Sequence, residues 1–182
     1  MYKVNIVKLP KNVLRKKSQN VPIPLSEEDV HLAETMIYHV DDSQKPKTRF
    51  RPAVGVAAVQ YGILKNVFYI HVKDHNDKTV FRDVLFNPEV LSKSESVVAL
   101  SDGEGCLSVK ENWPGQQGYV PRSARIKVKA YSYFKKEEVI YDVVDYVAIV
   151  FQHELDHLNG NLFIDRINTK NPWSKKSDWK LL

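Results

Sequence analysis

The chain has 182 residues and a formal net charge of +5, with 43% hydrophobic and 27% charged residues, which is ordinary for a soluble globular protein. No apolar run approaches the length of a membrane span and the N-terminus has no apolar signal core, so we expect a cytoplasmic protein. The single cysteine excludes an intrachain disulfide, and the length predicts one domain over residues 1–182.

The first predicted element in chain order is a helix over residues 26–40. Ser26 is followed by three acidic residues, which is the pattern of a helix N-terminus. Apolar residues then recur at helical spacing, at Val30, Ala33, Ile37 and Val40. The stretch that follows is polar and contains Pro46 and four cationic residues, so we expect residues 41–52 to be an exposed insertion.

Runs of β-branched and aromatic residues predict strands in the middle of the chain. We place them at residues 66–72, 79–86, 95–101, 126–131 and 137–144. Asn87-Pro88 is expected to end the second strand, because proline has no N–H to donate to a sheet. The fourth strand alternates between apolar and polar residues, and the fifth is its predicted hairpin partner.

A second helix is predicted late in the chain. Asp142 or Asp145 can cap its N-terminus, and Gly160 stands where a C-terminal glycine cap belongs. This helix is apolar nearly all round, which predicts that it is buried. The order of elements predicts an α+β fold, in which antiparallel or mixed sheets pack around this central helix. A polar, basic tail is expected at residues 168–182.

The late helix carries the most informative motif, residues 152–157, which read QHELDH. Two histidines four positions apart on a helix share one face, so His153 and His157 can bind a single ion. Glu154 points to a neighbouring part of the surface, where it can act as a general base on a water bound to that ion. This motif predicts that the central helix carries a metal site that catalyses hydrolysis.

Histidine pairs at this spacing also arise by chance. His71 and His75 form such a pair, but their surroundings predict a strand that runs into a turn, where the two side chains do not share a helical face. We therefore interpret His71 and His75 as surface or packing residues. A glutamate directly after the first histidine distinguishes the pair in the late helix from this one.

Two histidines are too few for a catalytic metal site, which normally has three protein ligands and one open position. Asp156 lies between the histidines on the wrong face of the helix. Cys106 is a candidate for the third ligand because it is the only thiol and lies beside glycine at a turn, where the backbone allows close approach. A metal-bound cysteine would be a thiolate.

At this point the chain resembles the peptide deformylase family. Three segments match the three motifs of that family in order: AVGVAAVQ at 53–60, EGCLS at 104–108 and QHELDHLNG at 152–160. The first motif departs from the pattern at Ala53, where the family usually has glycine, and at Val59, where it often has proline. The insertion and the lack of an evident long C-terminal helix look like the bacterial type 2 form.

The resemblance implies a hydrolase that removes the N-formyl group from the initiator methionine of nascent polypeptides and releases formate. It implies that Cys106, His153 and His157 bind one divalent metal ion, Fe²⁺ in this family, for which Ni²⁺, Co²⁺ or Zn²⁺ may substitute. It also implies catalytic roles for three further groups: the carboxyl of Glu154 in proton transfer, and the Gln60 amide and the Leu107 backbone N–H in holding the oxyanion.

The resemblance also implies an apolar slot for the methionine side chain, lined by Val54, Tyr146, Ile149 and Val150. Core packing is the alternative role for these four residues. Gly55 is expected to offer backbone hydrogen bonds to an extended peptide, which would pair like an added strand. Beside the third ligand, Glu104 is a candidate for a buried ion pair with Arg122.

We expect a monomer that acts on formyl-methionyl nascent peptides, with no membrane and no specific nucleic acid as partner. The cationic residues are spread along the chain with some concentration at 170–180, from which we consider a transient ribosome contact. Three alternatives stay open: a metallopeptidase with a downstream third ligand, a closed structural zinc module that binds nucleic acid, and a deformylase-like protein that has lost activity.

Overall fold

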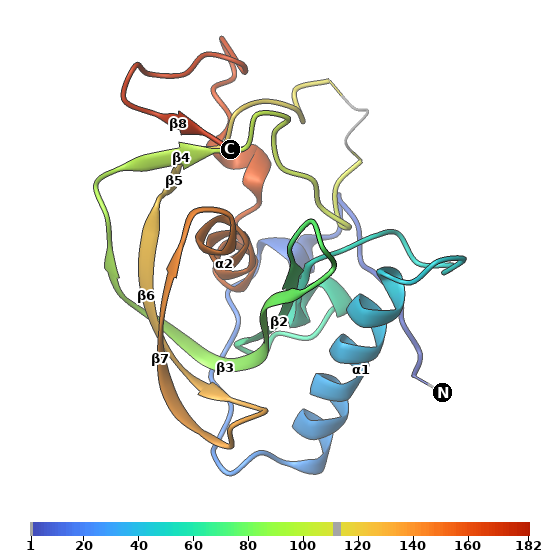
Figure 1. The fold of residues 1–182 in the computed structure, drawn as a ribbon. Coiled ribbons are helices and arrows are strands. Elements are labelled where there is room, and N and C mark those ends of the chain that lie inside the picture. The colour runs from blue at the N-terminus through green and yellow to red at the C-terminus, as the bar shows by residue number, and fades with distance from the viewer. Residues whose placement is uncertain (1, 111–113) are drawn as a thin grey trace.

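The protein is described by a computed structural model that covers residues 2–110 and 114–182 (Figure 1). Within these residues there are two α-helices, α1 (Glu27–Ser43) and α2 (Asp145–Leu158), and three short 3-10 helices, η1 (Asn12–Arg15), η2 (Ala58–Tyr61) and η3 (Phe163–Arg166). The strands are β1 (Gly55–Ala57), β2 (Val67–Lys73), β3 (Thr79–Lys93), β4 (Val97–Ala99), β5 (Arg122–Ser123), β6 (Arg125–Ser132), β7 (Glu137–Val144) and β8 (Lys180–Leu181).

The strands form two sheets. The larger is fully antiparallel in the order β1-β2-β3-β6-β7, and the smaller has the order β5-β4-β8, with β4 and β8 parallel. Figure 1 shows α2 in the middle of the molecule, with β6 and β7 on one side and β2 on the other, while α1 lies at the periphery. The predicted α+β class, with antiparallel and mixed sheets, is therefore confirmed.

Helix α1 begins as its sequence predicts and ends later. Ser26 and Asp29 form a capping box in which each side chain accepts a hydrogen bond from the backbone of the other residue. The helix continues to Ser43, so the first three residues of the predicted insertion are helical. The added turn is stabilised from outside the helix, because Asp41 accepts hydrogen bonds from Tyr69 and Arg82 of the neighbouring strands. The prediction that residues 41–52 form an exposed insertion was wrong at its start, because the sequence does not reveal these long-range contacts.

Strand β3 does not end at Asn87-Pro88, as the sequence had suggested, but runs through this pair to Lys93. The register shifts between Phe86 and Glu89, so the proline falls where the ladder has no hydrogen bond to lose. Asn87 has a φ of 51°, and its side chain bonds the backbone N–H and C=O of Val21 at 2.8 Å each. A bulge that is stabilised by hydrogen bonds to Val21 thus stands where the sequence predicted the strand to end.

The ends of α2 confirm one predicted cap and correct another. Neither predicted aspartate caps the N-terminus: Asp142 lies in β7 and pairs with Arg125, and Asp145 is the first helical residue after the cap position Val144. At the other end Gly160 has a φ of +74°, and a Cβ there would stand 2.6 Å from a backbone oxygen of Arg15. Only glycine fits this turn, as the sequence predicts.

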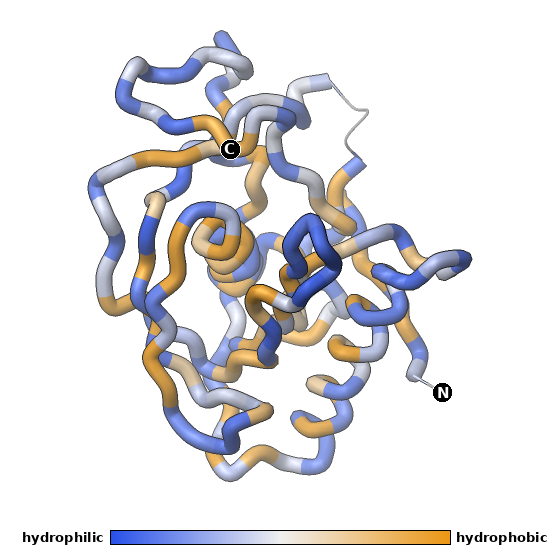
Figure 2. Tube along the Cα trace, viewed as in Figure 1, coloured by the Kyte–Doolittle hydropathy of each residue, from blue (hydrophilic) through white to orange (hydrophobic). Residues whose placement is uncertain are grey.

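The body of α2 is buried, as its apolar composition predicts. Ala148 and Phe151 have no exposed surface and pack with Phe68 and Ile70 of β2 and with residues of β6. Figure 2 shows both hydrophobic and hydrophilic colouring along this helix, as expected for an apolar helix that carries the polar motif. Packing on several sides holds the helix that carries the QHELDH motif in a fixed position. Among the described residues, no helix is both long and apolar enough to cross a membrane.

The polar tail is more ordered than the sequence suggested. Residues Lys180–Leu181 form β8, which pairs with β4 through Val98 and Ala99. The backbone of Leu182 continues this pairing, because its N–H donates to Ala99 and its C=O accepts from Ser101, each at 2.9 Å. The end of the tail is therefore bonded on both sides of Leu100. This segment is too short to give a strand pattern, so the sequence did not predict it.

Candidate active site

Three side chains converge at the centre of the molecule. The ligand atoms of Cys106, His153 and His157 all lie within 4.8 Å of one another, and Sγ of Cys106 is 3.3 Å from Nε2 of His157. The two histidines come from successive turns of α2, whereas Cys106 comes from the loop after β4. Among the described residues this is the cluster of thiol, imidazole and carboxyl groups that could hold a metal ion.

A buried ion-pair network supports the cluster from behind. Arg122 donates two hydrogen bonds of 2.8 Å to the carboxylate of Glu104, which confirms the predicted pair. The second oxygen of Glu104 is also 2.8 Å from Nδ1 of His153, so Nε2 of that ring remains for a metal. Burial would raise the pKa of Glu104, but Arg122 and His153 hold it below its ordinary value. Glu104 is thus a charged acceptor that orients His153.

Asp156 belongs to the same network and not to the ligand cluster. It accepts hydrogen bonds from Arg122 and from Arg166, so its carboxylate is turned away from the two histidines. This agrees with the sequence argument that Asp156 lies on the wrong face. Its partners could not be deduced from the motif, because Arg122 and Arg166 come from outside the helix.

Glu154 is a second buried carboxyl in this region and follows His153 directly in α2. It is 3% exposed, and its Oε2 has no hydrogen-bond partner among the described residues. Burial raises the pKa of Glu154 to about 7. A carboxyl with a pKa near the working pH can both accept and deliver a proton, as general acid–base chemistry requires. The backbone of Gly55 leaves room for this side chain, since a Cβ at residue 55 would stand 2.6 Å from Glu154 Oε1.

Gln60 is held with its amide donors toward the cysteine loop. Its Oε1 accepts from the backbone N–H of Ala57 at 2.9 Å, and its Nε2 donates to Ser108 Oγ at 3.1 Å and lies 3.6 Å from Cys106 Sγ. The one-turn helix η2 sets this orientation, because it places residue 60 beside the backbone of residue 57. Leu107 follows the cysteine and lines the same space.

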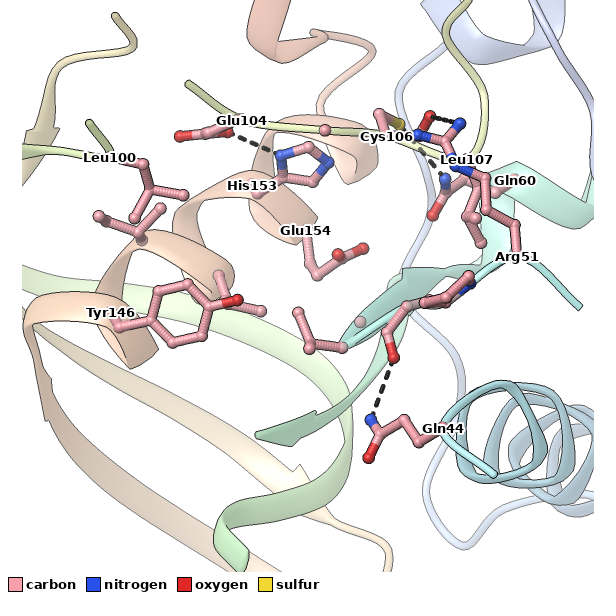
Figure 3. A pocket seen from close by; sticks show the side chains of 17 residues that line it. Gln44, Arg51, Gln60, Leu100, Glu104, Cys106, Leu107, Tyr146, His153 and Glu154 are labelled. Carbon is pink, nitrogen blue, oxygen red and sulfur yellow. Dashed lines mark hydrogen bonds and ion pairs between the residues drawn. The ribbon is translucent and has the colours of Figure 1, made fainter. Parts of the chain in front are cut away.

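A cavity of about 300 Å³ opens beside the cluster (Figure 3). It is lined by every residue that the sequence analysis assigned to the site except His157, which lies behind it: Val54, Gly55, Gln60, Cys106, Leu107, Tyr146, Ile149, Val150, His153 and Glu154. Tyr146 is 38% exposed, so it belongs to the cavity wall and not to the closed core. The structure therefore brings the predicted residues together in one place.

The cavity is also lined by residues that the sequence analysis had not assigned to the site, among them Gln44, Arg51 and Leu100. Gln44 Nε2 donates to the carbonyls of Ala53 and His71 at 3.0 and 2.9 Å. Arg51 Nη1 donates to the carbonyl of Cys106 at 3.1 Å. Gln44 and Arg51 fall in the stretch predicted to be an exposed insertion, and no local pattern marked them as part of a site.

His71 and His75 are remote from this site, as expected. His71 is buried and bonds Asp41 and Thr79, whereas His75 is exposed in the turn after β2. A thiol and two imidazoles beside a buried carboxyl, at the wall of an apolar cavity, are the arrangement of a metal-dependent hydrolase. The three ligand atoms suit a divalent ion with one position left open, and the unbonded Glu154 oxygen lies in the same cavity.

Comparison with known proteins narrows this class. The family model described as polypeptide deformylase matches residues 3–173. The peptide deformylase of Mycoplasmopsis pulmonis is 62% identical over 189 residues, covering 96% of each chain, and peptide deformylase 2 of Bacillus anthracis is 46% identical over 89% of this chain and 88% of its own. The chain belongs to the peptide deformylase family.

Solved structures of peptide deformylases have a similar fold, which agrees with this family assignment. A Met-Ala-Ser-bound class I type b peptide deformylase from Acinetobacter baumannii has a TM-score of 0.75 at 29% identity and covers 92% of this chain and all of its own. The peptide deformylase of Ehrlichia chaffeensis has the same TM-score at 28% identity, over 93% of this chain and 90% of its own. The chain is a hydrolase that removes the N-formyl group from formyl-methionyl nascent peptides.

Proposed function

We propose that deformylation takes place in the cavity beside Cys106, His153 and His157, and that these three residues hold one divalent metal ion, Fe²⁺, for which Ni²⁺, Co²⁺ or Zn²⁺ can substitute. The observation that carries this proposal is the convergence of three ligand atoms within 4.8 Å next to a buried carboxyl. Such an ion would polarise the formyl oxygen and lower the pKa of a water molecule. The helix that carries the two histidines is thereby the metal-binding helix of the fold.

Glu154 carries the proton in this proposal. Its carboxylate takes a proton from the attacking water and delivers it to the departing nitrogen, so that the C–N bond of the formamide breaks into formate and a free amine. The pKa of about 7 that burial produces suits both transfers near neutral pH. Because Oε2 has no partner among the described residues, it is available to a water molecule without breaking an existing hydrogen bond.

The oxyanion is held by two donors, the Gln60 amide and the backbone N–H of Leu107. Gln60 is fixed through its oxygen by Ala57, so its Nε2 is directed toward the cysteine loop before substrate arrives. A donor fixed in advance needs no reorganisation when the charge develops, and one such donor is worth roughly 3–4 kcal/mol of activation barrier.

The substrate is recognised by shape and by backbone pairing. Val54, Tyr146, Ile149 and Val150 line the cavity and offer an apolar surface to a methionine side chain. β1 is an edge strand of the larger sheet, so Gly55 can pair with an extended peptide that enters along this edge. The Met-Ala-Ser ligand of the Acinetobacter baumannii relative supports a short peptide as occupant.

We further propose a monomer in which residues 1–182 form one catalytic domain that works in the cytoplasm, with a transient ribosome contact through the basic residues of the tail. Replacing Lys170, Lys175 and Lys176 with alanine tests the contact without touching β8. Unchanged co-sedimentation with ribosomes at low salt would exclude it. Elution at the mass of a dimer in size-exclusion chromatography would exclude the monomer.

The first experiment is formate release from an N-formyl-methionyl tripeptide, with protein prepared without oxygen and loaded with Fe²⁺ or Ni²⁺. Glu154→Ala is compared at equal metal content. We expect turnover by the wild type and its loss in the variant with the metal retained. Equal turnover by both proteins would remove Glu154 from the mechanism, and full metal occupancy without any turnover by the wild type would indicate an inactive relative.

A further inference from the structure

Arg51 is a charged residue of the cavity wall to which the mechanism above assigns no role. It lies in the segment between α1 and β1, far along the chain from the cysteine loop. Its side chain lies beside Cys106 and Leu107, and Nη1 donates a 3.1 Å hydrogen bond to the backbone carbonyl of Cys106 (Figure 3). This bond joins the insertion to the loop that carries a ligand residue.

The carbonyl of Cys106 and the N–H of Leu107 belong to the same peptide unit. That unit is planar and trans, so its C=O and N–H point in opposite directions, and fixing the oxygen also fixes where the N–H points. A hydrogen bond to the carbonyl polarises the whole peptide group and makes its N–H a better donor. A guanidinium does so more strongly than a neutral donor, because its bond is charge-assisted.

The base of Arg51 is itself anchored. Two residues further on, Ala53 is bonded at both of its backbone groups to the end of α1. Its N–H donates to Ser43 Oγ at 3.1 Å. Its C=O accepts from Gln44 at 3.0 Å, the bond that Figure 3 marks at Gln44. Pro52 between them has a fixed φ. The guanidinium is therefore presented from a rigid segment. The Cys106 carbonyl also accepts a 3.3 Å hydrogen bond from the backbone N–H of Val109, so among the described residues Arg51 is the charged one of its two donors.

We propose that Arg51 is a positioning residue that orients and polarises the Cys106–Leu107 peptide, so that the Leu107 N–H is aimed and strengthened as an oxyanion donor. The inference rests on the role proposed for Leu107. It explains why a cationic side chain from the insertion reaches the carbonyl of this one peptide. Arg51 acts through Leu107 and need not touch the substrate.

A spectroscopic experiment tests the contact independently of activity. We would compare zinc-loaded wild type with Arg51→Met, which keeps much of the length but has no donor, and with Arg49→Met as the matched control. Arg49 stacks on the Phe50 ring outside the cavity. We expect the ¹³C resonance of the Cys106 carbonyl and the ¹⁵N resonance of Leu107 to move in Arg51→Met and not in Arg49→Met. Unmoved resonances in Arg51→Met would overturn the proposal.

Kinetics at equal metal content supply the second readout. We expect Arg51→Met to lower kcat about tenfold with KM within about twofold of wild type, since one oxyanion donor is weakened and not removed. Arg51→Lys should recover part of kcat, and added guanidinium should do the same for Arg51→Ala. A raised KM with unchanged kcat would indicate that Arg51 binds the substrate. A loss of metal affinity would indicate that Arg51 supports the metal ligand Cys106. Either result overturns the proposal. A wild type without deformylase activity would instead refute the proposed function.

Discussion

The carboxyl of Glu154 lies where a side chain on residue 55 would begin, because an ideal Cβ on Gly55 would stand 2.6 Å from Oε1, 3.1 Å from Cδ and 3.3 Å from Cγ of Glu154. All three of these contacts are with one side chain. The edge strand β1 and the buried acid of α2 thus share a space that only glycine leaves open. In the mechanism proposed above, the same position would serve both the approach of a peptide and the placement of the acid.

Gly55→Ala should displace the Glu154 carboxyl. We expect kcat on a formyl-methionyl tripeptide to fall by at least about tenfold, because a misplaced catalytic group loses its alignment with the substrate. The control is a double-mutant cycle on stability. The alanine should destabilise the wild type in urea and have a much smaller effect in a Glu154→Ala background, where the clash is absent. Equal destabilisation in both backgrounds would show that the strain lies elsewhere.

Glu104→Ala should destabilise the fold and weaken metal retention. The substitution leaves Arg122 buried without its bidentate partner and removes the acceptor of His153. Breaking a buried ion pair in this way typically costs about 3–5 kcal/mol in the free energy of unfolding. Asp142→Ala is the matched control, since it breaks an exposed pair with Arg125, and exposed ion pairs contribute little to stability. Urea unfolding and metal titration of both variants test this prediction. If Glu104→Ala changed neither the free energy of unfolding nor the metal affinity, a structural role for the pair would be excluded.

Deletion of Leu181 and Leu182 should affect the cavity wall. Hydrogen bonds from Leu182 to Ala99 and Ser101 hold the backbone on both sides of Leu100, which lines the cavity. We expect a several-fold increase in KM with a smaller effect on kcat, because uniform binding is weakened and not the chemistry. Lys180→Ala is the control, as it loses only an exposed contact with Asp145. Identical kinetics of the deletion variant and Lys180→Ala would show that β8 does not support the wall.

His39 should make stability depend on pH. It is 2% exposed, with Nδ1 2.9 Å from the Tyr61 hydroxyl, and burial lowers its pKa from 6.5 to about 4. The unfolded chain therefore binds a proton near pH 6.5 that the folded protein accepts only near pH 4. Stability is fully present above pH 6.5 and falls as the pH is lowered through this window. In urea unfolding from pH 7.5 to 4.5, His39→Gln should lose less stability than wild type by on the order of 1–3 kcal/mol. If the free energy of unfolding fell equally with pH in wild type and His39→Gln, His39 would not be the cause of the pH dependence.

Local patterns predicted the parts of the site that local geometry determines. The spacing of His153 and His157 needs only a helix to bring both rings to one ion, and the glycine at 160 needs only a tight turn. Composition also predicted β2, β6 and β7 closely and β3 and β4 with other bounds, whereas β1, β5 and β8 were not predicted. The α+β class could be predicted because the order of these elements leaves few ways to bury their apolar faces.

Long-range partners could not be predicted in this way. Arg51 reaches Cys106 across 55 positions, and Asp41 extends α1 by bonding strands 28 or more positions away. Strand β3 passes through Asn87-Pro88 because Asn87 bonds Val21, 66 positions earlier. None of these contacts is marked by a periodic pattern or a characteristic spacing in the sequence. Each requires knowledge of which segments the fold places side by side.

The parallel pairing of β4 with β8 also has a consequence in the order of synthesis. A ribosome makes residues 97–99 and the metal-site helix well before residues 180–182. The backbone around Leu100 can reach its described form only after the last of these residues has emerged. Until then, a growing copy lacks the hydrogen bonds that hold Leu100 in the cavity wall.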